Sequence, residues 1–336
     1  MRKLLLALLV IASTLITSGW GVRGHRSANR AAVDTLPGDD LAFLRKHRDW
    51  IGETGPLPDS WRGNSEPHSK LFEDPNHGWF KEQFAFMKQI PRSRYEFVLR
   101  LYDEHLRIKG KDPEAAKLMN VRWTGTLPYA AIENYDRMKS AMRAYRAASA
   151  ESPTRQFLAQ DIAFFMGWMG HYTADGAMPL HNSIHHDGWQ GENPKNYTRS
   201  GSIHARFETQ FVDLIQITEA DLMSQIGPAQ VLADPFQAIL NHLDDASTKV
   251  ETLYQLDLEK AFEAKDSKVG KDLVVRQLSK AATLLRDLTY TAWVESGKPA
   301  ARGAGGNPTS PTNPLYNPET GTAPPGPPAD WKPRVN

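Results

Sequence analysis

The sequence predicts an all-α protein built from a single multi-helical domain. Apolar residues recur at the 3.6-residue spacing of a helix over 95–108, 129–147, 155–174, 203–217, 231–264 and 274–295. We find no convincing run that alternates apolar and polar residues, as a half-buried strand would. With 336 residues and 40% hydrophobic content, the chain is long enough to bury one large core or two small ones.

The two ends of the chain differ from this helical middle. Arg2 and Lys3, an apolar run over 4–16 and small residues at 17–19 are typical of a secretory signal peptide cleaved before Trp20. The apolar run is too short to span a bilayer, so we expect a secreted or periplasmic protein without a transmembrane segment. The domain organisation predicted is a signal peptide (1–19), one domain (20–297) and a disordered Pro/Gly-rich tail (298–336).

Two stretches inside the domain are irregular. Five prolines break any long element over 50–94, and 182–202 is rich in Gly, Asn and Ser. The second stretch, 182–202, is predicted to be a long loop between two helices, and long loops in a compact domain are often functional.

Composition restricts the possible chemistry. The formal charge is +1, and it falls to −1 when Arg2 and Lys3 are removed, so no net basic field attracts nucleic acid or an anionic membrane. Any such partner must be recognised locally. The chain has no cysteine, which excludes disulfides and thiolate ligands. A metal site would therefore consist of nitrogen and oxygen donors.

Two pairs of metal-capable residues stand at helical i,i+4 spacing. They are His171 with Asp175 and His204 with Glu208. Residues four apart lie on one face of a helix, about 6 Å from each other, so each pair can bind one cation. Pro179 cannot continue the first helix, so His181 should leave its axis and be free to serve a second ion.

Other candidates lie nearer the N-terminus. After cleavage, Trp20 would carry a free α-amino group, and with His25 it would form a plausible ligand set; alternatively Trp20 is an apolar anchor and His25 packs or caps a helix. Asp59 and His77 lie in the irregular region, where a rigid scaffold can hold loop residues over the helices. His68 competes with His77 for this role.

Four segments resemble one known superfamily. The mature start WGVRGH and the blocks GTLPYAAIENY, GHYTADGAMPLH and HARFE are similar to the zinc-dependent phospholipases C and fungal-type single-strand nucleases. The resemblance implies an all-α domain with three zinc ions in one cleft. The ligands that it implies are the Trp20 amine and carbonyl, His25 and Asp175 for one ion; Asp175, Asp59, His77 and His171 for a second; and His181, His204 and Glu208 for a third.

The resemblance leaves the substrate open. The spacing from Trp20 to His25 is similar to the nucleases, whereas Glu208 is similar to the phospholipases, because the nucleases usually carry Asp there. The chain lacks the disulfides of the fungal nucleases. We expect an apolar rim near Trp79, Phe80 and Trp189 in a phospholipase, and a stacking slot for a base in a nuclease.

We therefore expect residues 20–297 to be a zinc-dependent phosphoric ester hydrolase, a phosphodiesterase similar to phospholipase C, in which a metal-activated water attacks phosphorus in line. The resemblance implies that Asp59 is the catalytic carboxylate, which would orient or deprotonate that water. The substrate would be a phospholipid or, alternatively, single-stranded nucleic acid, and no stable protein partner is implied. A non-catalytic, metal-stabilised binding protein is the least favoured alternative.

Overall fold

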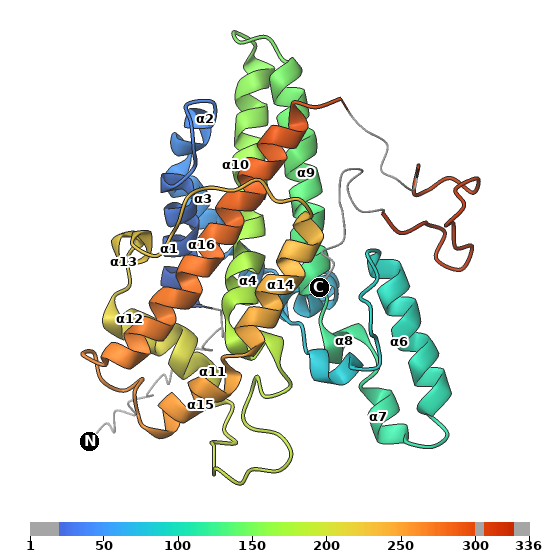
Figure 1. The fold of residues 1–336 in the computed structure, drawn as a ribbon, viewed down its shortest axis with the longest axis vertical. Helices are drawn as coiled ribbons and strands as arrows, with labels where there is room; N and C mark the ends of the chain where they lie inside the picture. The colour runs from blue at the N-terminus through green and yellow to red at the C-terminus, as the bar shows by residue number, and fades with distance from the viewer. Residues whose placement is uncertain (1–19, 300–305, 326–336) are drawn as a thin grey trace, which may run out of the picture.

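Two long neighbouring helices, α9 (Leu127–Ala147) and α10 (Pro153–Ala177), form the centre of the computed structural model, which describes residues 20–299 and 306–325 (Figure 1). The Ser152 side chain caps the first turn of α10, where Pro153 occupies the first helical position. The helix ends at Ala177 because Met178 is extended ahead of Pro179. The predicted helix at 155–174 and its termination by proline are confirmed.

The other helices surround this pair. The C-terminal helix α16 (Lys268–Ser296) packs against both, and α1 (Gly21–Asp34) packs against α10, α16 and α3 (Arg48–Thr54). The remaining elements are α2 (Ala42–Arg45), α4 (Leu57–Ser60), α5 (Pro67–Glu73), η1 (Asp74–His77), η2 (Lys81–Phe84), α6 (Arg94–Ile108), α7 (Pro113–Lys117), α8 (Val121–Thr124), η3 (Pro179–Asn182), α11 (Ser202–Ala205), the π-helix η4 (Arg206–Phe211), α12 (Val212–Ile215), α13 (Glu219–Met223), α14 (Pro235–Ser247) and α15 (Val250–Leu258).

The predicted class is confirmed in its coarse form, because the described residues form one mostly helical, compact domain without a β-strand. Three details differ from the sequence prediction. The helix expected at 203–217 is divided by the π-helix η4, the one expected at 231–264 is two helices, and the irregular stretch 50–94 contains several short helices. In the part of the chain that the structure describes, no helix is long and apolar enough to cross a membrane.

Within the segment predicted to be a disordered tail, the structure describes residues 306–325, which form turns. These turns are held by backbone hydrogen bonds from Asn317 to Thr322 (2.9 Å) and from Ala323 to Pro308 (2.7 Å), and Ala323 is only 2% exposed. Proline fixes φ at little entropic cost, so a Pro-rich segment can hold a defined turn without a helix. The predicted signal peptide 1–19, and the tail residues 300–305 and 326–336, lie outside the described residues.

Helix α1 approaches α10 closely at Gly170. A Cβ atom added to Gly170 would lie 2.0 Å from Oδ1 of Asn29. The Asn29 side chain cannot easily turn away, because its Nδ2 donates to the carbonyls of Ile51 and Gly167, both at 3.0 Å. The absence of a side chain at Gly170 therefore sets the distance between the two helices.

We expect Gly170→Ala to lower the free energy of unfolding by about 1–3 kcal/mol, because the new methyl group overpacks the α1–α10 contact. Urea denaturation measures the change. Gly110→Ala is the matched control, since a Cβ atom there would meet nothing within 4 Å. Equal stability of the two variants would show that the close approach at Gly170 is not required.

Candidate metal centre

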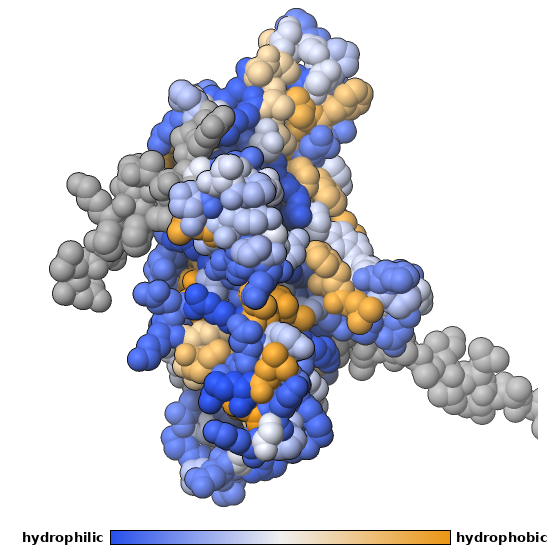
Figure 2. All heavy atoms as spheres, turned by 90° about the vertical axis from the view of Figure 1, so that its right-hand side faces the viewer, coloured by the Kyte–Doolittle hydropathy of each residue, from blue (hydrophilic) through white to orange (hydrophobic). Residues whose placement is uncertain are grey.

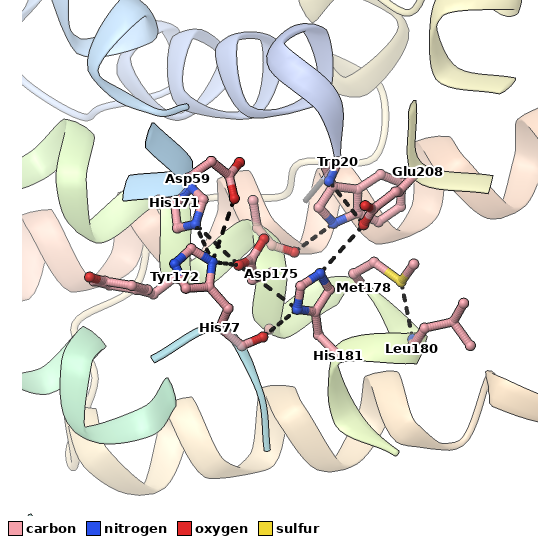
Figure 3. Close-up of polar contacts among 12 residues, drawn as sticks. Trp20, Asp59, His77, His171, Tyr172, Asp175, Met178, Leu180, His181 and Glu208 are labelled. Atoms are coloured by element: carbon pink, nitrogen blue, oxygen red, sulfur yellow. Dashed lines mark hydrogen bonds and ion pairs between the residues drawn. The ribbon is translucent and has the colours of Figure 1, made fainter. Parts of the chain in front are cut away.

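The histidines and carboxylates selected from the sequence converge on one region of the domain. Figure 3 shows Asp59, His77, His171, Asp175, His181 and Glu208 in this region. The selected residues come from seven separate elements that span most of the chain. Each is buried, with at most 5% of its surface exposed, except the half-buried His204. The residues are His25 on α1, Asp59 on α4, His77 on η1, His171 and Asp175 on α10, His181 on η3, His204 on α11 and Glu208 on η4.

Asp175 lies at the centre of the inner group. Its Oδ2 is 2.9 Å from Nδ1 of His77 and 3.1 Å from Nε2 of His171, which lies one helical turn earlier on α10. Its other oxygen, Oδ1, is 3.5 Å from Nε2 of His25. The two oxygens of this carboxylate therefore face different histidines, which is the arrangement that a bridging ligand requires.

His25 and Asp59 complete the inner group. The imidazole of His25 stacks on that of His171 with ring centroids 4.3 Å apart, and its Nε2 is 4.0 Å from Asp59. Both ring nitrogens of His25 and both carboxylate oxygens of Asp59 are buried without a hydrogen-bond partner. Such atoms are costly to bury. A cation bound among them would satisfy them.

The outer group consists of His181, His204 and Glu208. Nε2 of His204 is 3.1 Å from Oε2 of Glu208, as expected from the i,i+4 spacing, and Nε2 of His181 is 3.4 Å from the same oxygen. The two Nε2 atoms lie 3.3 Å apart. Glu208 lies in the π-helix η4, an irregular turn of the kind frequently found at functional sites.

Backbone carbonyls fix which ring nitrogen faces each group. The Nδ1–H of His171 donates to the Gly55 carbonyl and that of His204 to the His186 carbonyl, both at 2.9 Å, while Nδ1–H of His181 donates to the His77 carbonyl. In a neutral ring, the Nε2 atom then carries a lone pair. When both rings are neutral, lone pairs of His181 and His204 thus face each other. The contact becomes favourable with a metal cation between them or with a proton on His204: burial lowers the pKa of this ring, but Glu208 and Asp187 overcome burial and raise it to about 10. The direction of these rings is the ligand orientation typical of metal sites.

Glu73 was not found by sequence reasoning. This buried carboxylate lies 3.4 Å from Nε2 of His77 and also accepts a hydrogen bond from Tyr172. It therefore orients His77 with Nδ1 toward Asp175. The available signal was its own i,i+4 spacing to His77 at the end of α5.

The structure distinguishes the two candidate histidines of the irregular region. His77 is 3% exposed and contacts both Asp175 and His171, whereas His68 is exposed on α5. The α5 helix lies between Asp59 and His77 in the sequence, and η1, which carries His77, packs against α10. The intervening helix explains why Asp59 and His77 are far apart along the chain.

Trp20 is fully buried, and its contacts differ from those that the resemblance implies. Its backbone nitrogen donates to Oε2 of Glu208 at 3.2 Å, and its indole Nε1 donates to the Ala174 carbonyl at 2.6 Å. Its carbonyl accepts the N–H of Gly24 within α1. The nitrogen of Trp20 thus lies beside the outer group, while His25 lies in the inner one.

The buried charges shift the pKa values of the ligands in opposite directions. Burial alone would raise the pKa of Glu208, but His204 and His181 reverse the effect and lower it to about 2. Burial lowers the pKa of His25 to about 3, whereas Asp175 and Asp59 overcome burial and raise the pKa of His171 to about 9. Burial raises the pKa of Asp59. The buried carboxylates thus favour positively charged groups in the site, such as the protonated form of His171.

The outer group opens into a cavity of about 340 Å³. Four candidate ligands line this cavity: His77, His181, His204 and Glu208. Arg62 and Arg122 line it as well, together with Asp74 and Asp187. So do Phe80 and His186, whose rings stack with centroids 4.5 Å apart. The expected apolar rim is partly wrong, because Trp79 is 1% exposed and belongs to the core.

Comparison of the chain with protein-family models gives no match, and comparison with curated proteins gives no significant match. The resemblance to the zinc-dependent phospholipases C and single-strand nucleases therefore remains a prediction from the sequence motifs. The geometry establishes that buried histidines and carboxylates can hold metal ions.

We expect Asp175→Asn to remove more than one metal ion per chain, because each oxygen of this carboxylate faces different histidines. The substitution keeps the size and removes the charge. Elemental analysis of purified protein measures the content. Asp161→Asn, an exposed position on the same helix, is the control and should keep the full complement. Loss of one ion or none would contradict the bridging role of Asp175.

Proposed function

We propose that this protein is a secreted or periplasmic zinc-dependent phosphoric ester hydrolase similar to phospholipase C. The observation that carries the proposal is the set of imidazole lone pairs and buried carboxylates that converge beside a cavity lined by two arginines. Such a site combines positions for cations with guanidinium groups that suit an anionic substrate.

The donor atoms are compatible with zinc. Imidazole nitrogens and carboxylate oxygens are common zinc ligands. We assign three ions to three groups of side chains: His25 with Asp59 and His171; His77 with His171 and Asp175; and His181 with His204 and Glu208, beside which the Trp20 nitrogen lies. Bound zinc would polarise the phosphate oxygens and lower the pKa of a water molecule toward ~7. This supplies hydroxide at neutral pH without a nucleophilic side chain.

The protein side chains have separate tasks in this proposal. Arg62 and Arg122 would bind non-bridging phosphate oxygens in the cavity. Arg62 is itself held by Asp74 at 3.0 Å, which fixes the direction of its guanidinium group. Asp59, whose carboxylate has no hydrogen-bond partner, would bind metal and orient the attacking water.

Two other functions remain as alternatives. A single-strand nuclease would use the same metal site, and the stacked rings of Phe80 and His186 at the cavity offer a surface for a base. A structural metal scaffold is less favoured, because structural zinc sites are usually closed by four protein ligands. Here the outer group borders an open cavity instead.

We expect metal-loaded protein to hydrolyse at least one phosphate ester, and chelation to abolish the activity. Phosphatidylcholine, single-stranded DNA, single-stranded RNA and a simple chromogenic phosphodiester are tested side by side. Restoring zinc to the chelated protein is the control for irreversible unfolding. If fully metallated protein turns over none of these substrates, the hydrolase proposal fails and the scaffold function is favoured.

We expect a protein that begins at Trp20 to bind one more zinc ion than a protein with extra residues before it. A free α-amine can bind metal, whereas an amide nitrogen has no available lone pair at neutral pH. The Trp20 nitrogen lies 3.2 Å from Glu208, so the amine would enter the site directly. Zinc stoichiometry and phosphodiesterase rate measure the difference. Equal values in both proteins would leave Trp20 as a packing residue.

A further inference from the structure

Helix α6 carries an apolar row on its outer side. Its inner side contributes Phe97 and Leu101 to the core. The outer row consists of residues spaced three or four apart, which lie on one helix face: Tyr95 (62% exposed), Val98 (42%), Tyr102 (56%) and Leu106 (42%). A helix needs one apolar face to pack against the core of its domain, so the second apolar face of α6 is left exposed.

Exposed apolar side chains also occur on two short helices near the cavity, and the guanidinium of Arg94 at the start of α6 lies 5.6 Å from the ring centroid of Phe72 on one of them. Leu71 and Phe72 on α5 are 78% and 59% exposed, and α5 leads directly into η1, where Asp74, Pro75 and His77 line the cavity. Trp123 on α8 is 41% exposed and follows Arg122, another lining residue. On this side of the molecule, Figure 2 shows hydrophobic areas among hydrophilic ones. We call these exposed side chains, together with the row on α6, the α6 surface.

The same segment holds the positive charge of the chain. Residues 88–124 contain nine basic and five acidic residues, a formal charge of +4 in a protein whose total is +1. Within the described residues, five exposed cations of this segment make no ion pair: Lys88, Arg100, Lys109, Lys111 and Arg122. Lys109 and Lys111 follow the apolar row at the end of α6, and Arg122 precedes Trp123, whereas Lys88 and Arg100 line a separate pocket with Asp103 and Glu104. Cationic side chains beside an apolar helix face are typical of helices that lie in a membrane interface.

We propose that the α6 surface docks the protein on an anionic phospholipid surface and presents the metal cavity to it. This inference rests on the proposed hydrolase function and selects lipid as its substrate class. The aliphatic side chains decide between lipid and nucleic acid. Val98, Leu106 and Leu71 cannot stack on bases, but they can enter the boundary between headgroups and acyl chains. The tyrosines and Trp123 suit the same interface, since each has an apolar ring and a polar group.

The test compares two double variants of the same composition. Val98→Glu with Leu106→Glu places negative charge on the α6 surface, while Val231→Glu with Leu258→Glu does the same at positions that are 49% and 51% exposed elsewhere. Binding of the metal-loaded protein is measured by co-sedimentation with vesicles of phosphatidylcholine mixed with phosphatidylglycerol, and with pure phosphatidylcholine. We expect the unaltered protein to prefer the anionic vesicles, less so at high salt.

The first double variant should bind these vesicles about tenfold more weakly or worse, because each substitution loses apolar burial and adds repulsion. The second should bind like the unaltered protein. If the unaltered protein does not bind, or both variants bind equally, the docking surface is refuted. Binding of an oligothymidine that only the first variant loses, without vesicle binding, would assign the surface to nucleic acid and also overturn the proposal.

A water-soluble, short-chain phosphatidylcholine separates this inference from the proposed function. Its hydrolysis needs the metal cavity but no membrane surface. We expect the first double variant to keep its rate on this soluble substrate and to lose rate on anionic vesicles. If no protein hydrolyses the soluble ester while vesicle binding still depends on Val98 and Leu106, the hydrolase proposal fails and the docking surface stands.

Discussion

The close contact between α1 and α10 is the constraint on which the inner group depends. Gly170 leaves room for Asn29, whose amide joins α1 to two backbone carbonyls on other segments. One residue further along α10, His171 stacks on His25 of α1. A wider spacing of the two helices would separate these imidazoles, and the donor atoms from α1 and α10 could no longer reach the same cation. Packing of small residues therefore decides the chemistry of the site.

The site also places several carboxylates where they are almost fully buried. Asp59, Glu73, Asp175 and Glu208 are each at most 5% exposed, and the interior of a protein solvates such carboxylates poorly. The raised pKa of His171 compensates for part of this negative charge, because a proton on that ring places a positive charge beside the carboxylates. A metal cation would replace this proton with a stronger positive charge. Metal binding and folding stability should consequently be coupled in this protein.

Sequence spacing predicted the pairs of site residues that lie four residues apart along the chain. The pairs His171 with Asp175 and His204 with Glu208 followed from helical periodicity, and Pro179 correctly indicated the break before His181. Residues that are brought together by tertiary packing were less accessible. The role of Glu73 depends on how α5 lies under α10, and the π-helical turn at Glu208 is not visible in an apolar pattern. Helix α1 also escaped the periodicity search, since its buried face consists largely of small and polar residues.

The candidate ligands lie at two depths below the surface, and the depth of each ligand affects what it can do. The outer group borders the cavity, so a substrate phosphate would meet His181, His204 and Glu208 first. Asp59 does not line this cavity and lies behind His77, at 3.7 Å from its Nδ1. A carboxylate at that depth is well placed to hold a cation and to orient the water bound to it. It is poorly placed to exchange a proton with solvent. Of the two roles proposed for Asp59, the geometry thus favours that of a ligand over that of a general base.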